Sequence, residues 1–202
     1  MNNGKFIVFE GIDGSGKTSL IQSIKLELEN RNIKVQNYFE PTKYAHGIKI
    51  REFLSGKISL SYEEQIDLFL LDRKDSLEKN ILPSLNSGET ILLDRYFYSM
   101  AAYQSNEKIS STEIIQRNIS ENFILPDLLI YLDIEPKLAL ERTSKRGQAE
   151  VFETLSQLTK VKNEYEKILP KNCFRLNATL PNYELRDLCL TKILEFISPE
   201  SS

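Results

Sequence analysis

Short runs of aliphatic and aromatic residues alternate along the chain with longer segments in which apolar and polar positions are mixed. Strands buried on both faces of a sheet are short and almost wholly apolar, so these runs predict strands of a parallel sheet. The runs are Lys5–Phe9, Lys34–Phe39, Thr90–Leu93, Leu128–Leu132 and Cys173–Leu176. Their alternation with helix-like segments predicts a three-layer α/β fold, with a five-stranded parallel sheet and helices on both of its faces.

The segments between these runs are expected to form helices. The longest covers residues 61–85, where Ser61 and Glu64 have the spacing of a capping box and Pro83 lies near the end. Its apolar face is expected to consist of Leu68, Leu71, Leu77 and Leu82. Later helices are expected at Tyr98–Asn106, Ser111–Asn122, Pro136–Ser144, Thr154–Leu169 and Asn182–Ile197. No internal repeat or low-complexity linker divides the chain, so residues 1–202 are expected to form one domain.

A phosphate-binding loop joins the first expected strand to the helix that follows it. Its sequence follows the pattern G-x-x-x-x-G-K-[ST]. The residues of the loop are Gly11, Ile12, Asp13, Gly14, Ser15, Gly16, Lys17 and Thr18. The glycines let successive backbone N–H groups point at phosphate oxygens, Lys17 adds a positive charge, and the Thr18 hydroxyl is a ligand for Mg²⁺. The motif predicts a site for a nucleoside triphosphate. The alternative is an ordinary glycine-rich turn between a strand and a helix.

Composition narrows the classes of function. The chain has 202 residues, with 26 basic and 29 acidic side chains and a net charge of -3, so no global basic field favours nucleic acid or an anionic membrane. His46 is the only histidine, and Cys173 and Cys189 are far apart, which favours neither a zinc cluster nor a disulfide framework. The N-terminus lacks a leader pattern and no run is long enough to span a membrane. We therefore expect a cytoplasmic protein.

A second signal for phosphate chemistry lies where the apolar run 90–93 ends in Asp94 and Arg95. In α/β folds of this kind, ligands bind at the carboxyl ends of the strands, so both side chains are expected near the phosphate-binding loop. Asp94 is the second expected metal-site residue after Thr18, and the planar donor fork of Arg95 suits a phosphate. The alternative is a capping aspartate beside an exposed arginine.

The order of the motifs resembles that of thymidylate kinases, P-loop nucleoside-monophosphate kinases. The resemblance covers the chain from Lys5 to about Leu169, and its motifs are F-E-G-I-D-G-S-G-K-T at 9–18, E-P-T at 40–42, L-F-L-L-D-R at 68–73, D-R-Y at 94–96 with Ser99 and A-Y-Q at 102–104, and P-D-L at 126–128 through Y-L-D at 131–133. The resemblance implies transfer of the γ-phosphoryl group of ATP to dTMP in a magnesium-dependent reaction. It also implies a homodimer.

The resemblance assigns the acceptor nucleotide to residues beyond the loop. It implies that Arg95 contacts the dTMP phosphate, that thymine stacks on Phe69, and that Arg73 donates to a base carbonyl. Phe69 and Arg73 are four residues apart, so they project from one face of the long helix. Taken alone, a phenylalanine among leucines such as Phe69 is more often a core residue. The alternative for Arg73 is a pair with Asp72 or Glu78 on an exposed face.

The same resemblance assigns further contacts to the sugar and the acceptor phosphate. It implies that Asp13 reaches the sugar 3′-hydroxyl and the network around the acceptor phosphate, and that Tyr103 leaves no room for a 2′-hydroxyl. Ser99 and Gln104 are expected as polar contacts nearby. Glu40 is expected beside the acceptor site, although it also suits the start of a loop before a helix.

A mobile arginine is expected to stabilise charge on the moving phosphoryl group. Some relatives carry this arginine within the phosphate-binding loop, but Gly14 stands there in this chain. A segment at about 142–153 resembles the lid of relatives that supply the charge from elsewhere, so Arg142 and Arg146 are the expected catalytic arginines, together with Lys17, Asp13 and Arg95. The alternative is an exposed charge run at the end of a helix.

Two positions depart from the pattern of the relatives. Val151 stands where many relatives have a lid arginine, and Met100 stands where some have an asparagine or glutamine that bonds the base. Thymine selection is therefore expected to depend on Arg73, Phe69 and the shape of the pocket. The alternative functions are another nucleoside-monophosphate or deoxynucleoside kinase, or an ATP-binding switch without acceptor turnover.

Overall fold

The computed structural model describes residues 4–144 and 154–197, which contain a parallel sheet of five strands in the order β2-β3-β1-β4-β5. The strands are β1 (Phe6–Glu10), β2 (Val35–Phe39), β3 (Thr90–Asp94), β4 (Leu128–Asp133) and β5 (Phe174–Asn177). Each strand lies within one residue of its expected position. Strands β1 and β3 are parallel neighbours in the sheet, so their carboxyl ends lie side by side, with Phe9 in register with Asp94.

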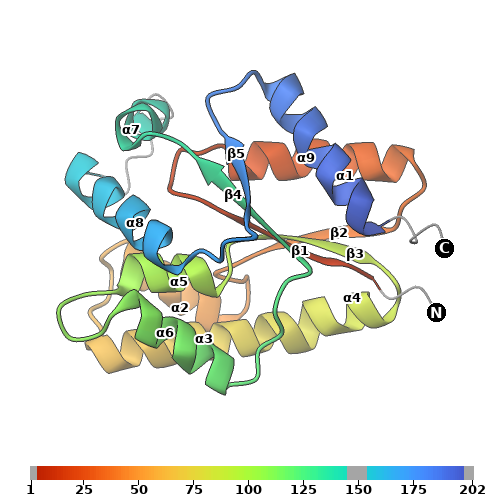
Figure 1. The fold of residues 1–202 in the computed structure, drawn as a ribbon. Coiled ribbons are helices and arrows are strands. Elements are labelled where there is room, and N and C mark those ends of the chain that lie inside the picture. Colours follow the sequence, from red (N-terminus) through yellow and green to blue (C-terminus); the bar gives the residue numbers. More distant parts are fainter. Residues whose placement is uncertain (1–3, 145–153, 198–202) are drawn as a thin grey trace.

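Helices cover both faces of the sheet, so the expected three-layer architecture is confirmed (Figure 1). Helices α1 and α9 pack together on one face, and the helices from α3 to α6 lie on the other. The helices are α1 (Lys17–Asn30), α2 (Ala45–Leu54), α3 (Tyr62–Ser76), α4 (Leu82–Asn86), α5 (Phe97–Gln104), α6 (Ser111–Ser120), α7 (Pro136–Ser144), α8 (Leu155–Ile168) and α9 (Asn182–Ile197).

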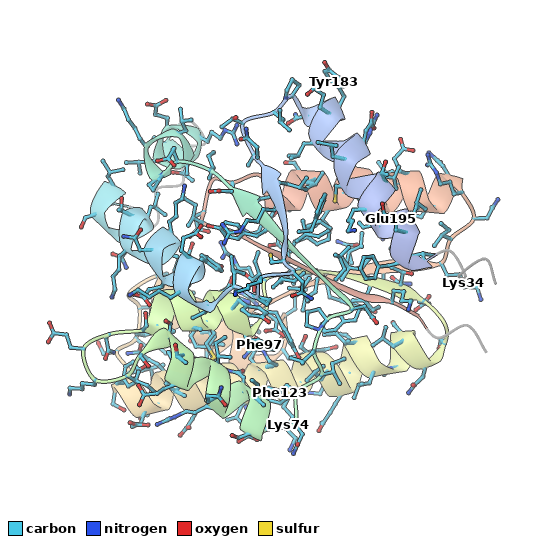
Figure 2. The ribbon with its side chains drawn as sticks, in the orientation of Figure 1. Lys34, Lys74, Phe97, Phe123, Tyr183 and Glu195 are labelled. Carbon is cyan, nitrogen blue, oxygen red and sulfur yellow. The ribbon has the colours of Figure 1, made fainter. Side chains whose placement is uncertain are left out.

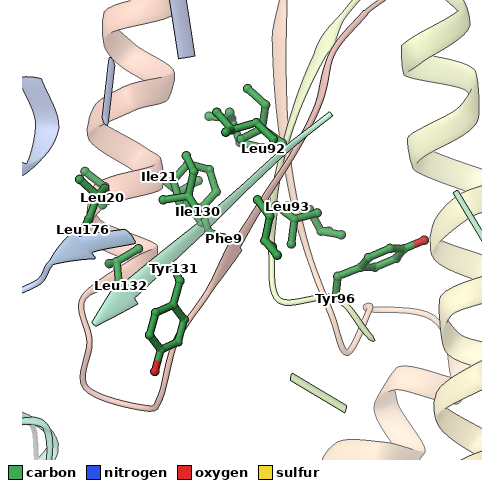
Figure 3. Packing of buried hydrophobic residues seen from close by; sticks show 14 of the residues in the cluster. Phe9, Leu20, Ile21, Leu92, Leu93, Tyr96, Ile130, Tyr131, Leu132 and Leu176 are labelled. Atoms are coloured by element: carbon green, nitrogen blue, oxygen red, sulfur yellow. The ribbon is translucent and has the colours of Figure 1, made fainter. Parts of the chain in front are cut away.

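The core is built on β1, which lies at the centre of the sheet and is buried along its whole length. Figure 3 shows Ile21 of α1 beside Phe9 and Ile130, and Leu20 beside Leu176, while Tyr96 extends towards the opposite layer. In Figure 2 side chains fill the space between the sheet and the helices. Burial of this apolar surface stabilises the sheet, and its rigidity holds the loops at the strand ends in place.

The long helix expected at 61–85 is divided into α3, a π-helical segment at Leu77–Ile81 and α4. Its capping box is confirmed. The expected apolar face is only half right, because Leu71 and Leu82 are exposed. The reason is that α3 turns a mixed face inward, in which buried Asp72 and Arg73 meet polar groups of neighbouring elements.

Helix α2 was not expected from the sequence. It contains Gly47, a residue that disfavours helix interiors. The structure explains this glycine, since a Cβ atom there would lie 2.1 Å from the carbonyl oxygen of Thr42. Arg51 of the same helix donates to the carbonyl oxygens of Pro41 and Thr42. The helix therefore fixes the loop that follows β2. No helix among the described residues is long and apolar enough to cross a membrane.

Candidate active site

The phosphate-binding loop connects the end of β1 to the start of α1, as expected. Gly14 and Gly16 have φ angles of 80° and 95°, conformations that side chains disfavour. Lys17 Nζ donates to the carbonyl oxygens of Gly11, at 2.9 Å, and Ile12, at 3.2 Å. Burial and the nearby charge of Arg95 lower the pKa of Lys17 to about 8. An anion in the loop would favour the charged form of this lysine.

Thr18 and Asp94, the two residues expected at a metal site, are in contact. The Thr18 hydroxyl donates to Asp94 Oδ2 at 2.8 Å. Asp94 Oδ1 is buried and has no hydrogen-bond partner among the described residues. A carboxylate and a hydroxyl oxygen beside a phosphate-binding loop are ligands suited to Mg²⁺, and the unpartnered oxygen fits the same ion.

A cavity of about 410 Å³ opens beside the loop. It gathers side chains from the loop after β2, from α3, from the end of β3 and from α5, which are far apart in the sequence. Expected acceptor-site residues that line it are Asp13, Glu40, Phe69, Arg73, Arg95, Ser99, Tyr103 and Gln104. Met100 also lines it. The structure thus brings together every residue that the sequence assigns to the acceptor nucleotide.

Arg95 connects the phosphate-binding loop to this cavity. Its Nη2 forms an ion pair with Asp13 Oδ1 of the loop, and its Nη1 donates to Ser99 Oγ at 3.0 Å and to the Gly11 carbonyl oxygen at 3.2 Å. The interpretation of Arg95 as an exposed side chain is wrong, since its side chain is only 19% exposed. A guanidinium fixed in this way places hydrogen-bond donors at the boundary between the loop and the cavity.

Asp13 and Tyr103 form a second contact across the same boundary. The Tyr103 hydroxyl donates to Asp13 Oδ2 at 2.6 Å and accepts from the Asp13 N–H at 3.1 Å. Burial favours the neutral acid, but the charges of Arg95 and Lys17 outweigh it and hold the pKa of Asp13 below its usual value. Burial raises the pKa of Tyr103, so the phenol stays protonated and donates to the carboxylate.

Arg73 is buried in the cavity wall and pairs with Glu40. Glu40 Oε2 accepts from Arg73 Nε at 3.0 Å and from Nη2 at 2.8 Å. The alternative partners, Asp72 and Glu78 on an exposed face, are wrong, because Arg73 is 1% exposed and Asp72 instead bonds the loop residue Thr42. Burial raises the pKa of Glu40 to about 7, against the lowering effect of the Arg73 charge.

Sequence reasoning missed two buried residues beneath Arg95. Glu10 Oε1 accepts from the backbone N–H groups of Tyr96, at 2.9 Å, and Ser99, at 3.2 Å. Glu10 thus caps the start of α5 from β1, which is far from α5 in the sequence. The Tyr165 hydroxyl of α8 donates to Glu10 Oε2 at 2.9 Å. The position of Glu10 directly before the loop was a usable signal for it, whereas nothing in the local pattern marks Tyr165.

The arginines expected in the lid are described only in part. Arg142 lies in the last turn of α7 and its Nη2 donates to the carbonyl oxygen of Ala178 at 2.9 Å. Arg146, Val151 and most of the segment 142–153 lie outside the described residues. Gly14 is closed to a side chain, because a Cβ atom there would lie 2.3 Å from the carbonyl oxygen of Ala139 in α7.

The fold and the phosphate-binding loop together are those of a P-loop kinase, and a second cavity adjoins the loop. A family model described as thymidylate kinase matches residues 9–188. The chain is 50% identical over 186 residues to a thymidylate kinase of Leptospira borgpetersenii, covering 92% of this chain and 91% of the relative. It belongs to the thymidylate kinase family, and the resemblance found in the sequence is confirmed.

Other relatives carry the same name over most of their length. A thymidylate kinase of Leptospira interrogans is 47% identical over 204 residues and is covered completely, as is this chain. A probable thymidylate kinase of Archaeoglobus fulgidus is 38% identical over 193 residues, which cover 95% of this chain and 96% of the relative. The similarity therefore extends across both the phosphate-binding loop and the second cavity.

Proposed function

We propose that the chain transfers the γ-phosphoryl group of ATP to dTMP, giving dTDP and ADP. The observation that carries this proposal is the direct contact between Asp13 of the phosphate-binding loop and Arg95 of the adjoining cavity. Two phosphate-bearing ligands bound on either side of this pair would face one another. An oxygen of the acceptor phosphate then bonds the γ-phosphorus while the bond to the β-phosphate oxygen breaks, and ADP leaves.

The donor side of the site is proposed to consist of the loop residues 11–18. Backbone N–H groups of the loop and of the start of α1 hold the phosphates, with the Lys17 ammonium at the outer ones. The side chain of Lys17 is buried among loop carbonyl groups, within reach of the loop interior. Bound phosphate would offer this ammonium a charged acceptor in place of neutral ones.

The acceptor side is proposed to hold the nucleotide by its three parts. Arg95 donates to the phosphate, with Ser99 as its support. Asp13 and Tyr103 contact the sugar, and the ring of Tyr103 limits the space beside it. Phe69 stacks on the base while Arg73 donates to a base carbonyl oxygen, and both side chains line the same cavity. Glu40 and Gln104 complete the polar lining.

The lid is proposed to supply the mobile positive charge. The close approach of Gly14 to Ala139 supports this, because an arginine at that position in the loop would clash with α7. Arg142 lies at the end of α7, where it donates to a neutral carbonyl oxygen. A hydrogen bond from the same guanidinium to a phosphate would be stronger, because the acceptor is charged. Arg146, which lies outside the described residues, is the second proposed arginine.

Mg²⁺ is proposed as the cofactor, held by Thr18 and Asp94. The unpartnered Oδ1 of Asp94 supports this assignment, since a buried carboxylate oxygen is seldom left without a partner. When bound, the ion would neutralise charge on the triphosphate. The remaining expectations, a single domain with a lid at 142–153, a homodimer, a cytoplasmic location and no nucleic-acid or membrane partner, stay predictions, and sedimentation velocity tests the dimer.

The proposal is tested by ADP release with ATP and one acceptor at a time, chosen from dTMP, dUMP, CMP, AMP and thymidine. We expect turnover with dTMP to exceed that with each of the others. Turnover of thymidine without turnover of dTMP would identify a deoxynucleoside kinase and overturn the proposal. ATP binding without ADP release for any acceptor would instead identify a nucleotide-dependent switch.

A further inference from the structure

The guanidinium of Arg73 is fixed on several sides. Glu40 Oε2 accepts from Nε and Nη2 on one side, and the rings of Tyr96 and Phe123 lie 5.0 and 6.0 Å from the guanidinium carbon. Phe123, labelled in Figure 2, follows the end of α6. The pair with Glu40 supplies only one of the acceptors that hold this group.

Asn118 of α6 holds Arg73 from another side. It is completely buried, and its Oδ1 accepts from Arg73 Nη1. Its Nδ2 donates to the Ile114 carbonyl oxygen at 2.8 Å, which fixes the direction of the amide because only the nitrogen can donate there. The amide oxygen is therefore committed to the arginine. The sulfur of Met100 lies 3.4 Å from Nη1 and is a weaker second acceptor.

These contacts leave one N–H of Arg73 for a ligand. A guanidinium has five N–H donors. Nε and one hydrogen of Nη2 are directed to Glu40, and Nη1 is directed to Asn118 and Met100. The other hydrogen of Nη2 has no partner among the described residues, and Arg73 lines the cavity. Rotation of the guanidinium away from Asn118 would redirect this donor.

We propose that Asn118 is a positioning residue that orients Arg73 and thereby selects pyrimidines that present a carbonyl acceptor over those that present an amino group. This inference rests on the proposed function. It gives the cavity a means of base selection although Met100, which lines it, has no strong hydrogen-bonding group. Asn118 acts through Arg73 and is not among the lining residues of the cavity.

The test uses the full chain with the substitution Asn118→Leu, which keeps a similar volume and removes the acceptor. We expect the KM for dTMP to rise about tenfold, the effect of losing about one oriented hydrogen bond, with the KM for ATP unchanged. The preference in kcat/KM for dTMP over dCMP, which carries an amino group in place of a carbonyl, is expected to fall about tenfold. Gln116→Leu, at an exposed position of the same helix, is the control and should match the wild type.

A lower melting temperature with an unchanged dTMP-to-dCMP preference would overturn the proposal, since it would show a purely structural role. Asn118→Asp gives a test that does not depend on folding of the leucine variant. It keeps an oxygen for Arg73 but cannot donate to Ile114, so we expect reduced stability with the preference retained within about threefold. Loss of the preference in a folded Asn118→Asp variant would also overturn the proposal.

A double-mutant cycle tests whether Asn118 acts through Arg73. Arg73→Lys removes the planar fork, and in that background Asn118→Leu is expected to have no further effect on the preference. A further loss of about tenfold would overturn the proposal. Wild-type protein that turns over dTMP, combined with an unaffected Asn118→Leu variant, refutes this inference alone. Wild-type protein inactive on dTMP refutes the proposed function, and the inference with it.

Discussion

Removal of the Tyr103 hydroxyl is expected to weaken the boundary between the two ligand sites. Tyr103→Phe keeps the ring, and with it the contact to the Arg95 guanidinium at 5.2 Å, but removes the donor to Asp13 Oδ2 and the acceptor for the Asp13 N–H. The perturbation is therefore confined to two hydrogen bonds. One of these two bonds is made to a charged group.

The size of the effect follows from the exposure of Asp13. A hydrogen bond to a charged group contributes about 1.5–3 kcal/mol. Because the Asp13 side chain is 31% exposed, we take the lower end, about 1.5 kcal/mol. For a chain of this length the melting temperature should fall by about 3–6 °C. Loss of this hydrogen bond to the carboxylate also raises the pKa of Asp13, because the bond favours the charged form.

The sign of the pH dependence follows from the lowered pKa of Asp13 in the folded state. The carboxylate contributes stability above the unfolded pKa of 3.8, and this contribution is lost as the pH falls through the folded pKa. The difference in unfolding free energy between wild type and Tyr103→Phe should thus be full at pH 7 and shrink below about pH 4.

Urea unfolding of both proteins between about pH 3 and 8 measures this difference. Tyr38→Phe is the matched control, because the Tyr38 hydroxyl bonds the uncharged Ser84 Oγ at 3.1 Å. Its effect on stability should not depend on the charge of a carboxylate. The reasoning would be refuted if Tyr103→Phe lowered the free energy of unfolding by the same amount at pH 7 and at pH 3. It would also be refuted if Tyr103→Phe lowered that free energy equally in wild type and in an Asp13→Ala background.

Three further predictions concern the two sites. Lys17→Ala should remove turnover, measured by ADP release, because the outer phosphates lose their buried ammonium; wild-type turnover would contradict its role. Arg95→Ala should abolish phosphorylation of dTMP while ATP binding, measured by calorimetry, stays within about threefold; retained dTMP turnover would contradict the acceptor assignment. Burial raises the pKa of Glu40 to about 7, above its unfolded value. The unfolding free energy of the wild type should therefore fall relative to that of Glu40→Gln as the pH rises from about 5 to 8. Urea unfolding measures this difference, and the opposite trend would contradict the raised pKa.

The central strands β1, β3 and β4 were the most predictable part of the sheet, because they are buried along almost their whole length and leave an uninterrupted apolar run in the sequence. The edge strands β2 and β5 are partly exposed and include polar residues, so their signal is weaker. Helix α2 left no comparable signal, since its form depends on packing of Gly47 against the loop of Thr42. The apolar face expected for residues 61–85 was only half right for a related reason, because part of the buried face of α3 consists of Asp72 and Arg73, whose partners come from distant parts of the sequence.

The site was predictable where its residues are close together in the sequence. The phosphate-binding loop is continuous, and Asp94 and Arg95 are marked by the strand that they end. The supporting residues are not marked in this way. Asn118 is 45 residues from Arg73, and Tyr165 is 155 residues from Glu10, so only the folded structure shows that each pair is in contact. The sequence marked residues that line the cavity, but it did not mark the buried residues that support them.

The backbone at Arg95 indicates why these buried supports are needed. Arg95 has a φ angle of 69°, a left-handed conformation that costs about 1 kcal/mol or more outside glycine. Its N–H donates to the Phe9 carbonyl oxygen at 2.9 Å, so the strained residue is tied to β1 at the point where the phosphate-binding loop begins. Glu10, the next residue of β1, caps the helix that starts after Arg95 and accepts from Ser99 Oγ, which itself accepts from the Arg95 guanidinium. Both the backbone and the side chain of Arg95 are therefore fixed by the strand that carries the loop, so the position of the cavity wall relative to the phosphate-binding loop is fixed as well.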